Sequence, residues 1–142
     1  MQITRYTDYA LRVLIYLGLK PNRLCSIQEI ASAYQISQSH LMKIVHHMSK
    51  ADFIKTVRGR NGGLQLSKKP EQISIGSVVR YTQETICPID CTDCIVRINC
   101  NLINIFYHAF KEFYSYLDNF TLADILKDPK GNPLQIIPYP SI

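Results

Sequence analysis

The stretch from residue 26 to residue 66 constrains the fold more than any other part of the chain. It begins with SIQE at residues 26 to 29, a capping-box pattern in which Ser26 and Glu29 satisfy each other's free backbone N–H groups at a helix start. This helix is expected to end near Tyr34, and Ser37 can cap another helix three residues later. Two short helices joined by a tight turn form a helix-turn-helix, which is therefore predicted here.

The helix after Ser37 is expected to have a buried side and a polar side. Its apolar residues recur at helical spacing and predict the buried stripe Leu41, Ile44, Val45 and Met48. The opposite side is polar and partly cationic, with Met42 and His47 at its edges. A recognition helix presents such a face to the major groove of DNA, although an ordinary solvated helix surface has the same composition. The candidate DNA-contacting residues of this helix are Gln38, Ser39, His40, Lys43 and His46.

Two short β-prone runs, at residues 53–57 and 64–66, follow this helix and predict a hairpin. The segment that joins them, RGRNGG, is rich in glycine and places Arg58, Arg60 and Asn61 at the tip. Such a tip can act as a wing that reaches along DNA phosphates or into a narrow minor groove. The glycines also have a purely structural explanation, because a tight turn with positive φ requires them in any hairpin.

The charge of the chain is unevenly distributed. Residues 1 to 84 carry twelve Lys or Arg against five Asp or Glu, whereas residues 85 to 142 carry four against six. A basic segment of this size suggests a polyanionic partner such as double-stranded DNA, although a solvated basic face without a partner would look the same. Charge alone does not separate these two interpretations.

A long amphipathic helix is predicted from Asn101 to about Leu117. Its apolar residues recur every three or four positions and form a stripe about 25 Å long at 1.5 Å per residue. A small domain does not readily cover so much apolar surface, so pairing with the same helix of a second copy is expected. The resulting twofold homodimer would match a palindromic operator. The alternative is that the helix packs back on its own domain.

Four of the five cysteines lie within fifteen residues, with the spacing C-x3-C-x2-C-x5-C. Clustered thiolates are suited to an iron-sulfur cluster or to zinc, although a zinc site usually contains two C-x2-C pairs and only one is present. A thiol redox couple at Cys91 and Cys94 would require a preceding βαβ unit, which the sequence does not predict. Disulfides are less expected because no signal peptide is recognised and a cytoplasmic protein is predicted.

The fold predicted from these features is mainly α with a small β-wing, and no segment is apolar enough to span a membrane. A winged helix-turn-helix domain occupies residues 1–84, and the cysteine-rich loop occupies residues 85–100. A dimerisation helix and a C-terminal helical segment follow over residues 101–127. Residues 128–142 contain several prolines and are expected to form an extended tail.

Six segments of the chain together resemble a known family. They are YTDYALRVLIYL, SQSHLMKIV, VRGRNGGLQL, IGSVVR, CIVRINC and LDNFTLADIL, in this order, and they extend over roughly residues 1 to 127. In this order they are similar to the winged-helix iron-sulfur transcriptional regulators of the NsrR and IscR type. The resemblance is closest to the nitric-oxide-sensing NsrR branch, to which the TDYALR, SHLMK and DNFTLADIL segments are similar.

The resemblance implies a dimer in which a loop before the dimer helix holds a 2Fe-2S or 4Fe-4S cluster. Cys94 and Cys100 match the spacing of the last two cysteine ligands, and Cys91 is the preferred first ligand. Cys87 is the alternative first ligand, and as a further thiolate it could also replace the fourth ligand that the NsrR branch implies, Asp8 of the partner subunit. Asp8 also has a structural explanation, because a carboxylate stabilises the N-terminus of a helix without any metal.

These observations predict a cluster-controlled DNA-binding regulator, in particular a repressor that senses nitric oxide, and no enzyme activity. One alternative is an IscR-like regulator that senses the supply of iron-sulfur clusters or the redox state. A second is a zinc-stabilised DNA-binding module or a thiol-disulfide redox protein.

Overall fold

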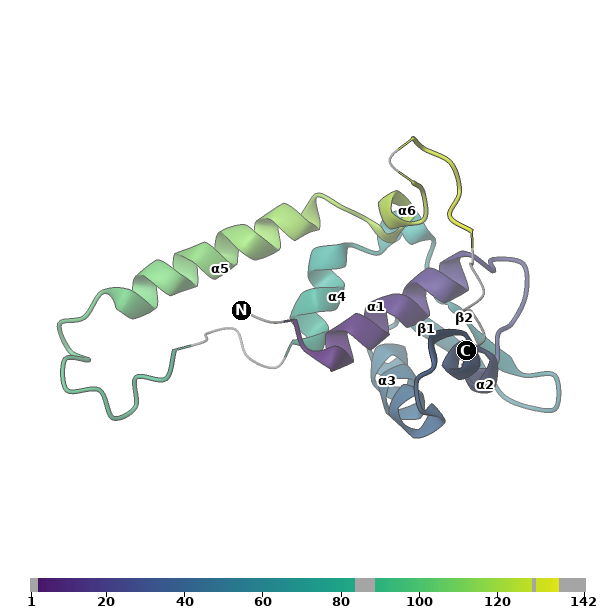
Figure 1. Ribbon diagram of the computed structural model, residues 1–142, viewed down its shortest axis with the longest axis horizontal. Helices are drawn as coiled ribbons and strands as arrows, with labels where there is room; N and C mark the ends of the chain where they lie inside the picture. The colour runs from purple at the N-terminus through teal and green to yellow at the C-terminus, as the bar shows by residue number, and fades with distance from the viewer. Residues whose placement is uncertain (1–2, 84–88, 129, 136–142) are drawn as a thin grey trace.

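Helices dominate the fold, as predicted, and one small antiparallel sheet accompanies them (Figure 1). The computed structural model describes residues 3–83, 89–128 and 130–135. In chain order the elements are α1 (Arg5–Gly18), α2 (Ile27–Tyr34), α3 (Gln38–Lys50), β1 (Ile54–Val57), β2 (Gly63–Leu66), the 3-10 helix η1 (Pro70–Gln72), α4 (Ile75–Thr82), α5 (Leu102–Asp118) and α6 (Leu122–Ile125). No helix in the described part of the chain is both long and apolar enough to cross a bilayer.

The main core forms between α1 and α3. Helix α1 buries Ala10, Val13, Leu14 and Leu17, while α3 buries the predicted stripe of Leu41, Ile44, Val45 and Met48. Because these stripes follow the 3.6-residue period, burying them fixes the rotation of both helices about their axes. Helix α1 starts at Arg5, because the hydroxyl of Thr4 caps it by accepting a hydrogen bond from the backbone N–H of Thr7 at 3.2 Å.

The helix-turn-helix has the caps that the sequence predicted. Ser26 and Glu29 form the capping box at the start of α2, and Ser37 accepts a hydrogen bond from the backbone of His40 at 3.4 Å. Between the helices Gln35 adopts a left-handed conformation with φ of 53°, and the N–H of Ile36 bonds to a carbonyl of the preceding helix. This conformation ends α2 and aims the chain directly into α3.

The wing is a two-stranded hairpin with a short third contact. Strands β1 and β2 pair in register from Ile54 with Leu66 to Val57 with Gly63. Cys25 adds two backbone hydrogen bonds to Leu64, of 3.0 and 2.8 Å, and its side chain is fully buried. A Cβ at Gly63 would lie 2.9 Å from the carbonyl oxygen of Cys25, so the close approach of these segments requires glycine. The hairpin is thereby attached to the segment that precedes α2.

Helix α5 extends away from the body and contacts it only through its C-terminal half (Figure 1). Tyr114 is the one fully buried residue of α5 and packs against Ile75 and Val79 of α4. Asp118, the last residue of α5, pairs with Arg80 and accepts a hydrogen bond from the hydroxyl of Ser74 at 3.1 Å. These contacts fasten one end of a 17-residue helix to α4.

After α5 the chain returns to the body and closes it. The backbone N–H of Leu122 bonds to the carbonyl of Ile73 at 2.8 Å, and the Leu122 side chain is fully buried. The expected tail is not extended where the structure describes it, over residues 130–135. There the chain turns back, so that Pro133 pairs with Lys127 and the Asp128 carboxylate accepts hydrogen bonds from Asn132.

Candidate nucleic-acid interface and cysteine loop

The polar face predicted for the recognition helix lies on the surface of α3. Its five candidate residues are all exposed: Gln38, Ser39, His40, Lys43 and His46. The three candidates of the wing tip, Arg58, Arg60 and Asn61, are also exposed. In Figure 1, α3 lies at the bottom of the body and the hairpin tip projects at its lower right. The structure therefore presents a helix and a cationic hairpin tip to solvent without burying any of their predicted contact residues.

A surface hollow of about 690 Å³ connects the end of α3 to the wing. Ser49 of α3 and Thr56 of β1 share a hydrogen bond of 3.3 Å across it, and Lys55 and Arg58 lie along its edge. Cations and hydroxyl groups are what a phosphate of the DNA backbone binds, and the Asp52 carboxylate in the same lining is paired with Lys68. The sequence analysis missed Ser49, Lys55 and Thr56, because only the fold brings the end of the helix next to the strand.

A second hollow, of about 250 Å³, lies between the first turn of α1 and the first turns of α3. It is lined by Arg5, Tyr6 and Tyr9 of α1 and by His40, Lys43 and Ile44 of α3. Arg5 was not predicted as part of an interface, because it lies 22 positions before Ile27, the first residue of the helix-turn-helix. The structure nevertheless places its helix beside two candidate DNA-contacting residues.

Two tyrosines hold α3 in place through His47. The Tyr6 hydroxyl of α1 and Nδ1 of His47 are 2.8 Å apart and share a hydrogen bond. Tyr81 of α4 stacks on the His47 ring at 4.3 Å and donates a hydrogen bond to its backbone carbonyl at 3.0 Å. His47 was placed at the edge of the polar face, but its side chain is half-buried and serves to join α3 to α1 and α4.

Glu29 connects the start of α2 to α1 by a hydrogen bond and to the preceding loop by an ion pair. Glu29 pairs with Arg23 and accepts a hydrogen bond from the Tyr16 hydroxyl at 2.7 Å. The hydrogen bond from Arg23 is the largest cause that lowers the pKa of the Glu29 carboxyl to about 2. Burial and the hydrogen bond to Glu29 raise the pKa of Tyr16 to about 12. At neutral pH Glu29 is therefore charged and Tyr16 is neutral.

Residues 89–100 of the cysteine loop lie at the free, N-terminal end of α5, far from the α4 contact (Figure 1). The backbone N–H of Cys94 bonds to the carbonyl of Cys91 at 3.4 Å, so these two residues share one turn. Cys94 and Cys100 are exposed free thiols, and Cys91 is half-buried. Asp90 fixes the preceding turn by accepting hydrogen bonds from the backbone and the hydroxyl of Thr92. Cys87, the alternative ligand, lies outside the described residues.

The donor set of the loop suits an iron-sulfur cluster by its chemistry. Thiolates are the ligands that such clusters use, and these thiols are accessible. Over residues 3–83, 89–128 and 130–135, however, no three His, Cys, Asp or Glu side chains lie close enough together to hold a metal ion. The conformation of one chain thus does not bring together the three predicted ligands Cys91, Cys94 and Cys100.

Asp8, the other predicted ligand, lies on the first turn of α1. Both of its carboxylate oxygens accept hydrogen bonds from Nε of Arg12, at 2.9 and 3.0 Å. The two side chains remain nearly half exposed. Asp8 therefore has a structural partner within its own helix, and its carboxylate is also accessible to a second molecule.

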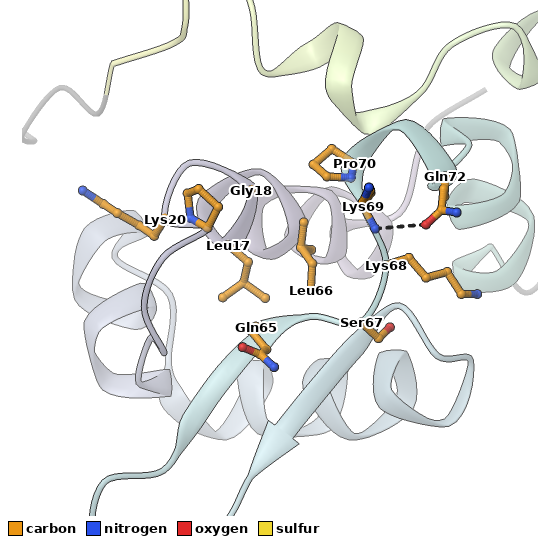
Figure 2. Close-up of a pocket in the computed structure, with 11 residues that line it drawn as sticks. Leu17, Gly18, Lys20, Gln65, Leu66, Ser67, Lys68, Lys69, Pro70 and Gln72 are labelled. Carbon is orange, nitrogen blue, oxygen red and sulfur yellow. Dashed lines mark hydrogen bonds between the residues drawn. The ribbon is translucent and has the colours of Figure 1, made fainter.

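A pocket of about 420 Å³ lies between the end of α1, β2 and η1 (Figure 2). Lys20, Lys68 and Lys69 lie along it, but Figure 2 shows the Lys20 and Lys68 side chains pointing in opposite directions. Lys68 is instead paired with Asp52 at 3.3 Å. The pocket therefore does not concentrate positive charge at one point.

A helix-turn-helix whose recognition helix is exposed and followed by a cationic hairpin defines a winged-helix DNA-binding transcriptional regulator. The comparison with protein families agrees and is more specific. Residues 3–128 match the Rrf2 family, described as iron-dependent transcriptional regulators, and the chain belongs to this family.

Curated and solved relatives support this assignment. The chain is 44% identical over 134 residues to the HTH-type transcriptional regulator NsrR of Geobacillus kaustophilus, covering 90% of this chain and 91% of that protein. The structure of T. potens IscR has a TM-score of 0.72 at 24% identity and covers 89% of this chain and 86% of that one. The structure of CymR of Staphylococcus aureus has a TM-score of 0.68 at 28% identity and covers 84% of this chain and 93% of that one. The predicted fold and the predicted family resemblance are thus confirmed.

Proposed function

We propose that this regulator is a cytoplasmic repressor that binds a palindromic operator as a homodimer and releases it when nitric oxide attacks an iron-sulfur cluster in the cysteine loop. The observation that carries the proposal is the position of residues 89–100 of this loop at the free end of α5, a helix that extends beyond the body (Figure 1). The similarity to NsrR over nine tenths of the chain supports nitric oxide as the signal.

The homodimer is supported by the apolar surface that α5 and the loop expose. Eight large apolar side chains of this region are 40% to 100% exposed: Ile95, Val96, Ile98, Leu102, Ile103, Ile105, Tyr107 and Tyr116. A patch of this kind marks a protein interface, and a second copy of the same helix provides a complementary apolar stripe. Twofold pairing through α5 would present two α3 helices to a palindromic site.

Cys91, Cys94 and Cys100 are the proposed thiolate ligands. The fourth ligand is either Cys87 or Asp8 of the partner subunit, whose carboxylate is accessible and would exchange its hydrogen bonds with Arg12. A bound iron-sulfur cluster supplies iron atoms with which nitric oxide reacts. The chain itself supplies the ligands and the connection to α3.

That connection runs through described contacts from the loop to the recognition helix. The loop leads directly into α5, and α5 is fastened to α4 by the Asp118 pair with Arg80 and by the packing of Tyr114. Helix α4 in turn holds α3 through Tyr81 and His47. A change in the position of α5 is therefore passed to α3 by packed and hydrogen-bonded groups. A bias of a few kcal/mol between the two arrangements is sufficient to shift most of the population.

The test is an anaerobic titration of the cluster-loaded protein with nitric oxide. An operator is first selected from a library of random duplexes, and its affinity is then followed by fluorescence anisotropy while the visible absorption of the cluster is recorded. We expect affinity and absorption to fall together. A C94A variant is the control and should lack both the colour and the response to nitric oxide.

Unchanged affinity during the loss of absorption would refute the proposal. A response to the loss of the cluster but not to nitric oxide would instead support a sensor of cluster supply. Comparing D8A with C87A by visible absorption identifies the fourth ligand, because only the ligand's removal should alter the spectrum.

A further inference from the structure

We infer that Met42 of α3 reads the methyl group of a thymine in each operator half-site, and is therefore a specificity-determining residue. This inference rests on the proposed placement of α3 in the major groove. It assigns to one side chain the chemical group that it recognises.

Met42 lies within the base-reading face of α3 rather than at its edge. Ser39, Met42, Lys43 and His46 are all exposed and follow the spacing i, i+3, i+4, i+7. The recognition helix of homeodomains contacts bases and backbone in the major groove from positions with this same spacing. A helix that enters the groove with Ser39 and Lys43 toward the DNA therefore brings Met42 to the same depth.

The core fixes Met42 in its outward position. Its side chain is 59% exposed, whereas Leu41 and Ile44, on either side of it, are 1% and 2% exposed. Any rotation of α3 that buried Met42 would expose either Leu41 or Ile44. The hydrogen bond between His47 and Tyr6 opposes the same rotation. Met42 is thus an apolar group held on a face whose other exposed residues are polar or charged.

Single exposed apolar residues are common on protein surfaces, so exposure alone does not assign a role to Met42. The assignment depends on the chemistry of the groove. The C5-methyl of thymine is the apolar group that base pairs present in the major groove, and hydrogen-bonding side chains such as Ser39 gain nothing from it. Methionine is unbranched, flexible and polarizable, and these properties allow it to fit a methyl group on an irregular surface.

The size of the effect follows from the group that becomes buried. Removing one methyl from an apolar contact costs ~0.8 kcal/mol, which corresponds to about fourfold in affinity. A palindromic site has two half-sites, so removing both methyl groups should weaken binding by roughly fifteenfold if the half-sites act independently.

The experiment replaces thymine by deoxyuridine, which lacks only this methyl group. Each thymine of the selected operator half-site is exchanged in turn, and anisotropy gives the affinity of the cluster-loaded dimer for each duplex. The same series is measured for M42A and for M42L, the latter retaining an apolar side chain of similar size. We expect one position at which the exchange lowers the affinity of the natural chain and of M42L for the duplex about fourfold. At the same position the affinity of M42A should not change.

Two results would overturn the inference. In one, no thymine of the half-site is sensitive to the exchange in the natural chain. In the other, the sensitivity remains undiminished in M42A, which would show that another residue contacts the methyl group. Either result leaves the proposed regulator intact, provided that Q38A or K43A weakens operator binding. If neither of these variants weakens binding, the placement of α3 in the groove is itself wrong.

Discussion

The contact between α4 and α5 depends on Gly76, and replacing it by alanine tests whether this contact holds the α5 arm. A Cβ at this position would lie 2.1 Å from Oδ1 of Asp118, 2.8 Å from its Cγ and 2.9 Å from its backbone nitrogen. The Asp118 side chain could rotate away, but only by losing its pair with Arg80 and its hydrogen bond from Ser74. The backbone nitrogen can move only if α5 itself moves.

The expected net effect is a loss of stability. Alanine within a helix is favoured over glycine by about 1 kcal/mol, which opposes the clash. Overpacking costs about 1–3 kcal/mol, and the Arg80 pair, both of whose side chains are about 40% exposed, contributes at most about 1 kcal/mol more. We therefore expect G76A to lower the free energy of unfolding by about 1–2 kcal/mol, measured by urea denaturation followed by circular dichroism.

A second substitution identifies the cause. D118A removes two of the three atoms that the added Cβ would meet, so G76A should cost less in a D118A background than in the natural chain. K111A, at an exposed position of α5, is the control and should change stability by less than about 0.5 kcal/mol. A G76A variant that is more stable than the natural chain would show that helix propensity outweighs the contact, which would refute the reasoning.

Two further predictions concern DNA affinity and acid stability. R58A and R60A should each reduce the slope of log affinity against log salt by about one, because each wing arginine that contacts a phosphate displaces counterions from the DNA. K130A, away from the wing, is the control and should leave this slope unchanged. Anisotropy titrations at several salt concentrations measure the slope. The Glu29 carboxyl, with its pKa lowered from 4.5 to about 2, stabilises the fold above pH 4.5, and this contribution is lost as the pH falls from 4.5 toward 2. R23A should therefore lose less unfolding free energy between pH 5 and pH 3 than the natural chain, and an equal loss in both would contradict the assigned cause.

Local features of the fold were predictable because their causes are local. The caps at Ser26 and Ser37 and the stripe that includes Leu41 could be identified from spacing alone, and the structure confirms them. The cap of α1 at Thr4 is local as well, because the Thr4 side chain accepts its hydrogen bond from the N–H of Thr7, three residues later.

Contacts between distant residues were not predictable in the same way. Gly76 and Asp118 are 42 positions apart, and nothing in helical periodicity pairs them. The same holds for His47 and Tyr81, whose rings stack on each other, although His47 was expected at the edge of the polar face. For the cysteines, the spacing indicates thiolate ligands for a metal or cluster, but the path of the loop decides which sulfur atoms come together at one site. Their ligand roles therefore stay predictions.

The arm formed by the cysteine loop and α5 is anchored to the body at both of its ends. Gln83 accepts hydrogen bonds from Thr4 and Thr7 at one end, and the carbonyl of Phe120 accepts one from Ile75 at the other. Both anchors lie on or beside α4, and neither uses a base-reading residue. Substitutions in the cysteine loop therefore leave the base-reading residues of α3 unchanged, whereas substitutions that alter the pairing of α5 would change the spacing between the two α3 helices.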